Sequence, residues 1–256
     1  MKLGIVTYNI AKDWDLDTII EMCENTGMEG VELRTTHAHG VEVELNKEER
    51  ADVKKKFQDS KIELAGLGSA FDYHSADQDA VRKNIEGTKE YTILAKDVGA
   101  PGIKVRPNGF QEEAGIPKEK TLEQIGKSLR ECGEFAADYG VQIRLEVHGR
   151  GTSYVPNIRK ILDIADHENV VACWNSNQGE VEDGSIKQYF DLLAGRIGLV
   201  HMRDLVAGYP WGELLCLLKE SGYEGFCLGE IPGSPEPERI LRYYRAVFDA
   251  LTGSCC

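Results

Sequence analysis

The sequence predicts an α/β fold, a single (β/α)8 TIM barrel that spans residues 1–256 as one domain. Eight short apolar segments typical of strands alternate strictly with segments of helical period, and successive strands begin 27 to 40 residues apart. Strict alternation predicts a parallel sheet with right-handed crossovers, and eight units close a barrel. An open doubly wound sheet would usually carry a glycine-rich loop after its first strand, whereas residues 8–14 contain no glycine.

The expected strands begin near Lys2, Gly30, Ile62, Gly102, Gln142, Asn169, Ile197 and Gly225. Helical period predicts helices over 16–26, 48–57, 79–98, 121–139, 158–165, 186–193, 211–218 and 239–251. Gly27, Gly99 and Gly140 follow three of these helices as stop signals. The third helix has an apolar stripe at Val81, Ile85, Tyr91, Leu94 and Val98, and the fourth at Leu122, Ile125, Leu129, Cys132 and Ala136.

Composition excludes several classes of partner. The chain is 41% hydrophobic and 29% charged, which is ordinary for a globular protein. Its net charge is −13 and no basic stripe occurs, so nucleic acid is not expected as a partner. Residues 1–8 are typical of a strand rather than a signal peptide, and no apolar run reaches membrane length. We therefore expect a cytoplasmic protein without a membrane partner.

The seven cysteines show no spacing suited to a zinc site or a disulfide framework. Most are expected to pack as small hydrophobic residues in a reducing cytoplasm, with Cys255 and Cys256 in a frayed tail. Cys173 shares strand parity with Asn175, which indicates a packed position facing the barrel interior.

Residues 142–149 combine an apolar and an ionisable strand face. Arg144, Glu146 and His148 alternate with Ile143, Leu145 and Val147, so the two sets point to opposite sides of the sheet. Similar polar ends recur at 31–34, 103–106, 200–203 and 228–231. Functional groups of a closed barrel lie at the carboxyl ends of its strands, so these ends predict one polar pocket.

Three of these strand ends supply groups suited to catalysis or to a metal. Glu146, His201 and Glu230 offer carboxylate and imidazole groups that hold a divalent metal, and two carboxylates beside a sugar can transfer a proton between adjacent carbons. The structural alternative is a salt bridge between either glutamate and Arg34, Arg106 or Arg203, but terminal strand positions of barrels favour the functional interpretation.

The segments 145–148, 172–178, 199–204 and 229–231, with 30–33, resemble strand ends of the xylose-isomerase-like barrel superfamily. That group contains sugar and sugar-phosphate isomerases and epimerases, inosose dehydratases and abasic-site endonucleases. In its epimerases a Glu, an Asp, a His and a second Glu hold one divalent metal, and the two Glu act as acid and base. By position the resemblance implies a metal site of Glu146, Asn175, His201 and Glu230, with Glu146 and Glu230 catalytic.

The chain departs from that pattern at Asn175 and Gln178, where the family has Asp and His. An amide oxygen holds a divalent cation less strongly than a carboxylate does. Two outcomes follow: His148 substitutes as a ligand in a weakened site for Mn, Mg, Co or Zn, or protein cations replace the metal. The residues predicted to bind substrate are Arg34, Lys104, Arg106, His148, Gln178, Arg203 and His74. Their four cations favour a sugar phosphate or sugar acid.

The sequence thus predicts a sugar or sugar-phosphate isomerase or epimerase that transfers a proton through an enediolate between Glu146 and Glu230, with a weakened or absent metal site. The alternatives are a carbohydrate-binding barrel without catalysis and a related dehydratase or lyase. Endonuclease activity is disfavoured, because the chain is acidic and retains few further metal ligands. The expected partner is a small carbohydrate, and the oligomeric state is not readable.

Overall fold

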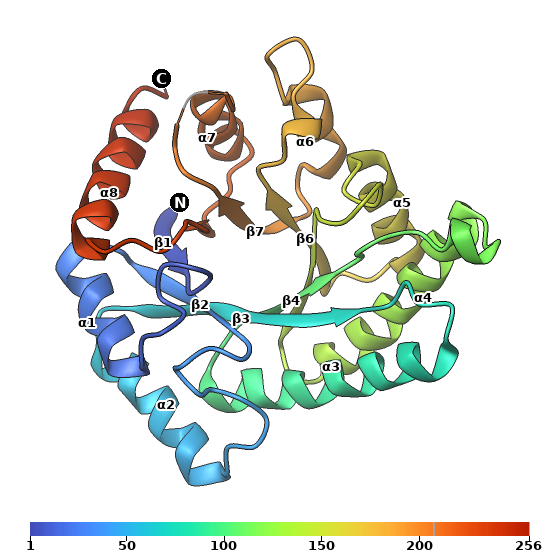
Figure 1. Cartoon of the computed structure of the whole chain (residues 1–256), viewed down its shortest axis with the longest axis horizontal. Coiled ribbons are helices and arrows are strands. Elements are labelled where there is room, and N and C mark those ends of the chain that lie inside the picture. The colour runs from blue at the N-terminus through green and yellow to red at the C-terminus, as the bar shows by residue number, and fades with distance from the viewer. Residues whose placement is uncertain (207, 256) are drawn as a thin grey trace.

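The computed structural model describes residues 1–206 and 208–255, which form a closed barrel of parallel strands surrounded by α-helices (Figure 1). The strands pair in chain order, and β8 closes the barrel against β1. They are β1 (Lys2–Val6), β2 (Gly30–Arg34), β3 (Glu63–Asp72), β4 (Gly102–Arg106), β5 (Gln142–Glu146), β6 (Val170–Asn175), β7 (Ile197–Met202) and β8 (Phe226–Gly229). The predicted (β/α)8 fold is confirmed.

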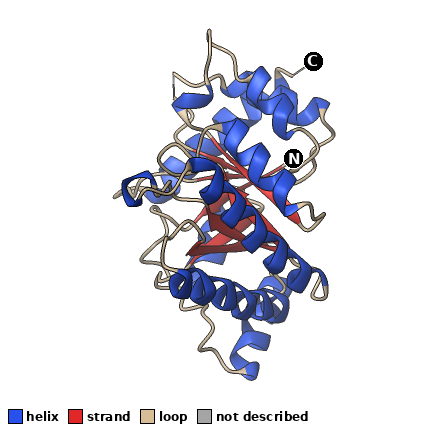
Figure 2. Ribbon diagram, turned by 90° about the vertical axis from the view of Figure 1, so that its right-hand side faces the viewer, coloured by secondary structure: helices blue, strands red, loops and turns tan. Residues whose placement is uncertain are grey.

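One helix follows each strand, and Figure 2 shows these helices outside the strands. They are α1 (Leu16–Thr26), α2 (Lys47–Asp59), α3 (Gln78–Val98), α4 (Lys118–Ala137), α5 (Val155–Ala165), α6 (Lys187–Leu193), α7 (Trp211–Glu220) and α8 (Pro237–Gly253). Two short 3-10 turns, η1 (Glu112–Ala114) and η2 (Gln178–Glu180), lie in loops. Among the described residues no helix is both long enough and apolar enough to cross a membrane.

Three helices begin earlier than their apolar period predicts, and a proline stands at each start. Helix α4 begins directly after Pro117, α5 carries a proline within its first two positions, and α8 begins at Pro237. Proline has its φ fixed near the helical value and needs no amide donor in the first turn. The chain therefore enters these helices two or three residues before the starts that the apolar period predicts.

The barrel wall has an apolar outer face and a mixed inner face. Ile143, Leu145 and Val147 of the fifth strand segment are fully buried in the main core, beside helix residues such as Leu129. Inside the barrel, Val6, Ala65, Cys173, Leu199 and Leu228 form a small apolar plug. Cys173 thus faces the interior, as strand parity predicts. Val6, the last residue of β1, also lines the cavity at the carboxyl ends of the strands, so this cluster forms part of the cavity floor.

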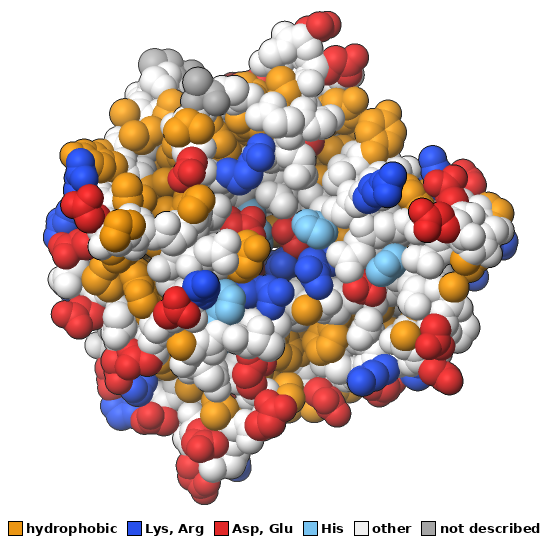
Figure 3. Space-filling view, in the orientation of Figure 1, with side chains coloured by type: hydrophobic (Ala, Val, Ile, Leu, Met, Phe, Trp, Pro, Cys, Tyr) orange, Lys and Arg blue, Asp and Glu red, His pale blue; other side chains and the backbone are white. Residues whose placement is uncertain are grey.

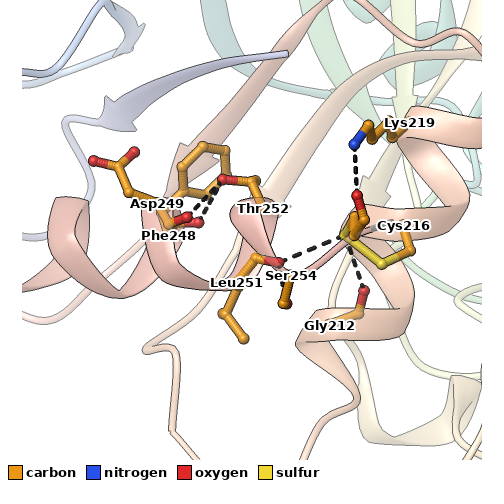
Figure 4. Close-up of a disulfide and its surroundings, with 9 residues drawn as sticks. Gly212, Cys216, Lys219, Phe248, Asp249, Leu251, Thr252 and Ser254 are labelled. Atoms are coloured by element: carbon orange, nitrogen blue, oxygen red, sulfur yellow. Dashed lines mark hydrogen bonds between the residues drawn. A yellow bond between two sulfur atoms is a disulfide. The ribbon is translucent and has the colours of Figure 1, made fainter.

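The expectation that no cysteines pair and that Cys255 is frayed is wrong. Cys216 on α7 forms a disulfide with Cys255, which is buried after the end of α8 (Figure 4). Lys219 also donates a hydrogen bond of 2.6 Å to the carbonyl oxygen of Cys255. The pair is separated by 39 residues and is brought together by packing of α7 against α8, which sequence spacing does not reveal. The free cysteines are buried as expected, namely Cys23, Cys132, Cys173 and Cys227, and Cys256 lies outside the described residues.

Candidate active site

A cavity of about 620 Å³ opens at the carboxyl ends of the strands. Figure 3 shows basic and histidine side chains gathered around a hollow near the middle of this face. The polar side chains that line it come from strands on all sides of the barrel and the loops that follow: Arg34, Lys104, Arg106, Glu146, His148, Asn175, Asn177, Gln178, His201, Arg203, Asp204 and Glu230. This is where the strand-end argument places a site.

Of the residues predicted from the sequence to form the site, His74 alone is not among those that line this cavity. Its Nδ1 atom lies 3.0 Å from Oδ1 of Asp72, and Asp72 also accepts a hydrogen bond from Asn108. His148 follows the last residue of β5 rather than lying within the strand, yet its ring still faces the cavity. Arg144 lies deeper, where it donates a hydrogen bond of 2.7 Å to the carbonyl oxygen of Ala65.

Glu146, His201 and Glu230 converge although they come from β5, β7 and the end of β8. One ligand atom of each residue lies within 4.8 Å of those of the other two. Nδ1 of His201 is 3.8 Å from Oε1 of Glu146 and 3.9 Å from Oε2 of Glu230. The His201 and Glu146 side chains are almost fully buried, whereas the Glu230 side chain is 23% exposed. The two acids therefore face one space.

Glu146 is held as an anion by its neighbours. Lys104 donates to Oε2 at 2.9 Å, and Nδ2 of Asn175 donates to Oε1 at 3.2 Å. Burial alone would raise the pKa of Glu146, but Lys104 and the His201 imidazole outweigh it and lower that pKa well below its usual range. A carboxyl group that transfers protons near neutral pH works best with a raised pKa, and the pKa of Glu146 is shifted in the opposite direction.

Glu32 on β2 is a site residue that the sequence argument did not single out. It has no exposed surface, and its Oε1 atom lies 3.4 Å from Nε2 of His201. Glycines on β3 make room for this carboxylate, because a Cβ atom at Gly68 would lie 2.7 Å from Oε1. Neither atom makes a hydrogen bond among the described residues, so the buried carboxylate acts on the His201 imidazole through its charge. The signal in the sequence was the parity that Glu32 shares with Arg34, opposite the glycines at 66 and 68.

Glu180 in η2 was also missed. It is buried behind the cavity wall, where it accepts hydrogen bonds from Tyr209 Oη at 2.9 Å and from the backbone amide of Asn177 at 3.1 Å. Burial raises the pKa of Glu180 to about 8, although these donors partly offset the shift. Trp174 donates in turn to Tyr209 at 3.1 Å. These bonds tie the loop after β6 to the loop after β7, and no strand pattern could have revealed them.

The cluster has the chemistry of a divalent-metal site. Two carboxylates and an imidazole suit a borderline cation, and Nδ1 of His201 is a buried atom with no hydrogen-bond partner among the described residues. Asn175 stands beside them, but its Nδ2 donates to Glu146 and its amide carries no charge. The donors fit a divalent cation, with one negative charge fewer than a set that contains aspartate.

Comparison with known proteins identifies the family. The model of the xylose isomerase-like TIM barrel family matches residues 20–250. The chain belongs to this family. Inosose isomerase of Bacillus velezensis is a family relative, 23% identical over 217 residues that make up 84% of this chain and 76% of that protein.

Solved structures show the same fold at low identity. D-psicose 3-epimerase of Clostridium cellulolyticum H10, solved with D-tagatose, superimposes with a TM-score of 0.82 at 17% identity and covers 98% of this chain and 99% of its own. The IolI protein, solved with a bound zinc atom, superimposes with a TM-score of 0.78 at 20% identity and covers 100% of this chain and 99% of its own. The resemblance inferred from the strand ends is thus confirmed at the level of the family and the fold.

Proposed function

We propose that this family member is a sugar isomerase or epimerase that transfers a proton between adjacent carbons through an enediolate. Glu146 and Glu230 act as the acid and the base. The proposal depends on one observation, the convergence of these two carboxylates with His201 within 4.8 Å over a single cavity. The names of its relatives, an inosose isomerase and a D-psicose 3-epimerase, support the same class of reaction.

The surroundings of Glu146 and Glu230 suggest which protonation state and which role each has at the start of the reaction. Lys104 keeps Glu146 ionised, so Glu146 enters the reaction able to accept the proton next to the substrate's carbonyl. Once Glu146 is protonated, the adjacent ammonium favours return of that proton. Glu230 is more exposed and faces the same space, so it can deliver or remove a proton at the neighbouring carbon or oxygen. Arg203 on the rim can stabilise the negative charge that develops on the substrate's oxygens.

A divalent metal is part of the proposal. Glu146, His201 and Glu230 would hold the cation, with the amide oxygen of Asn175 as a neutral fourth donor. The bound cation would polarise the carbonyl and hydroxyl oxygens of the substrate. The zinc atom in the IolI structure supports such a group here. Because Asn175 contributes no charge, we expect weaker metal binding than at a site with aspartate.

Isotope exchange tests the reaction directly. Purified protein is incubated with a panel of ketoses in D₂O, with Mn²⁺ added or with EDTA, and NMR follows deuterium at the carbons beside the carbonyl and any new isomer. We expect exchange with the native protein, its loss in Glu146→Gln, and loss of the new isomer in Glu230→Gln. The matched control is Glu224→Gln, an exposed glutamate before β8 that lies outside the cavity. Exchange that persists in Glu146→Gln, a new isomer formed by Glu230→Gln, or no exchange with any ketose under either condition contradicts the proposal.

A second candidate is a carbohydrate-binding barrel without catalysis. It is favoured by the neutral Asn175, which donates to Glu146, and by the occupation of the second Glu146 oxygen by Lys104. This candidate predicts sugar binding by calorimetry without deuterium incorporation. A dehydratase or lyase would share the enediolate, and loss of water or of a fragment from the product would identify it in the same NMR spectra.

A further inference from the structure

We propose that the substrate carries an anionic group, a carboxylate or a phosphate, and that Arg34 and Arg106 bind it on the β2–β4 side of the cavity. This inference rests on the proposed function, because it names the substrate class for the same site. It commits to where the charged group lies relative to the reacting carbons.

The first observation is that these arginines have no carboxylate partners. Most arginines of the chain form ion pairs on helix surfaces, as Arg82 does with Glu131 at 2.7 Å and Arg245 with Glu29 at 3.1 Å. Within the described part of the chain, Arg34 and Arg106 form no such pair, although acidic residues outnumber basic ones by 43 to 30. In a protein with surplus carboxylates, unpaired arginines in a cavity indicate that their partner comes from outside.

The second observation concerns the donors that remain. Arg34 uses Nη1 to bond the carbonyl oxygen of Thr35 at 2.9 Å, and Arg106 uses Nη2 to bond that of Ala70 at 2.9 Å. Each bond fixes one edge of a guanidinium group and leaves other donors available. Nε of Arg106 is buried and has no hydrogen-bond partner among the residues described. A buried donor without an acceptor is costly, so this guanidinium group is incompletely satisfied by the protein, and a bidentate oxyanion would supply acceptors to the donors that remain accessible.

The third observation is the division of charge across the cavity. Arg34 and Arg106 end β2 and β4, on either side of β3, whereas Glu230 follows β8 and Asp204 follows β7. Arg203 also lies on that second side, where the carboxylates of Asp204 and Glu230 outnumber it, so the net positive region lies over β2–β4. A cavity of about 620 Å³ has room for a small sugar that extends from the Glu146–Glu230 pair to this region.

Calorimetry on Glu230→Gln, which is not expected to turn over substrate, tests the inference apart from the chemistry. The probes are D-fructose, D-fructose 6-phosphate, the keto acid D-fructuronate and inorganic phosphate. We expect D-fructose 6-phosphate or D-fructuronate to bind about tenfold or more tightly than D-fructose. Whichever of these two charged sugars binds more tightly shows whether the site prefers a phosphate or a carboxylate. Adding Arg106→Gln or Arg34→Gln is expected to weaken that binding about tenfold and to leave D-fructose binding unchanged.

Arg150→Gln is the matched control, because Arg150 is exposed, outside the cavity lining and likewise without an ion pair among the described residues. Circular dichroism verifies folding of each variant, and Arg106→Lys, which keeps the charge but not the planar fork, serves if Arg106→Gln does not fold. Equal affinity for neutral and charged sugars, or anion binding that survives both arginine substitutions, overturns the inference. If anion binding depends on Arg106 but no isotope exchange occurs, the anion site stands and the proposed reaction is contradicted. If neutral ketoses exchange but no anion binding depends on Arg106, the proposed reaction stands and the anion site is contradicted.

Discussion

Replacement of Lys104 by methionine tests how far the charges inside the barrel depend on one another. Nζ of Lys104 lies 2.9 Å from Oε2 of Glu146, and the two side chains are only 7% and 4% exposed. At this distance and an effective dielectric constant of about 20, the Coulomb attraction is roughly 6 kcal/mol. Part of it offsets the desolvation of the ammonium, so removal of one partner is expected to cost about 3–5 kcal/mol.

That loss is a large share of a typical free energy of unfolding, about 5–15 kcal/mol, and corresponds to a fall in Tm of roughly 10 °C for a chain of this length. Urea unfolding followed by circular dichroism measures it. The double variant Lys104→Met/Glu146→Gln is expected to be more stable than Lys104→Met, because the uncompensated anion is then gone. The comparison is a double-mutant cycle that isolates the coupling between the two groups.

Lys127→Met is the matched control. Lys127 bonds Glu123 at 2.8 Å, but this pair lies on the surface of α4, where solvent screens it. We expect the free energy of unfolding of this variant to be nearly the same as that of the native protein. Equal effects at Lys104 and Lys127, or losses at Lys104 and Glu146 that simply add, would refute the view that a buried ion pair holds Glu146 as an anion.

Three further predictions concern the metal, a buried acid and the disulfide. Asn175→Asp adds a charged donor, so we expect Mn²⁺ to bind this variant roughly tenfold more tightly and to raise its Tm further. The pKa of Glu180 is about 8 in the folded chain against an ordinary 4.5, so folding takes up a proton between these values and stability falls as pH rises, by up to about 1.4 kcal/mol per pH unit. Glu180→Gln should flatten this slope in urea unfolding from pH 5 to 8. The Cys216–Cys255 disulfide spans 39 residues and contributes up to about 4 kcal/mol, so dithiothreitol should lower the Tm of the native protein and leave Cys255→Ser unchanged.

Each of these has a clear contrary result. A Tm that responds equally to Mn²⁺ in native protein and Asn175→Asp would show that residue 175 does not contribute to metal binding. An unchanged pH slope in Glu180→Gln would place the titration elsewhere. A Tm of the oxidised native protein that dithiothreitol does not alter would show that the disulfide is absent or energetically silent.

Local signals in the sequence were sufficient for the fold. Strand starts were predicted from alternating apolar segments, and the glycine stops after α1 and α3 adopt the left-handed conformation that glycine accepts without strain, as at Gly27 with φ of 74° and Gly99 with φ of 87°. The predicted starts of α4, α5 and α8 were two or three residues too late. The apolar period shows which residues face the core and does not mark the first turn of a helix. Pro117 and Pro237 were the better markers.

The candidate site was predictable in position but not in its internal contacts. Parity along each strand directed Arg34, Lys104 and Arg106 towards the cavity. Strand parity could not show that Lys104 bonds Glu146 or that Glu32 lies beside His201. Those contacts depend on which inward-facing side chains of different strands lie at the same height along the barrel axis. Strand stagger and the irregularity in register between β2 and β3 determine these levels, and neither is encoded by spacing within one strand.

The departure at Asn175 and the ammonium of Lys104 act in the same direction. Asparagine removes one negative charge that the family resemblance implies at this position, and the ammonium of Lys104 adds a positive charge beside Glu146. Both features weaken the binding of a divalent cation, and both reduce the repulsion that Glu146, Glu230 and Glu32 exert on a negatively charged molecule. Arg34 and Arg106 form no ion pair within the described part of the chain, so the same two features that weaken the metal site make the cavity more favourable to an anionic sugar. The weak metal site and the charged substrate that we propose are then two consequences of the same local charge balance.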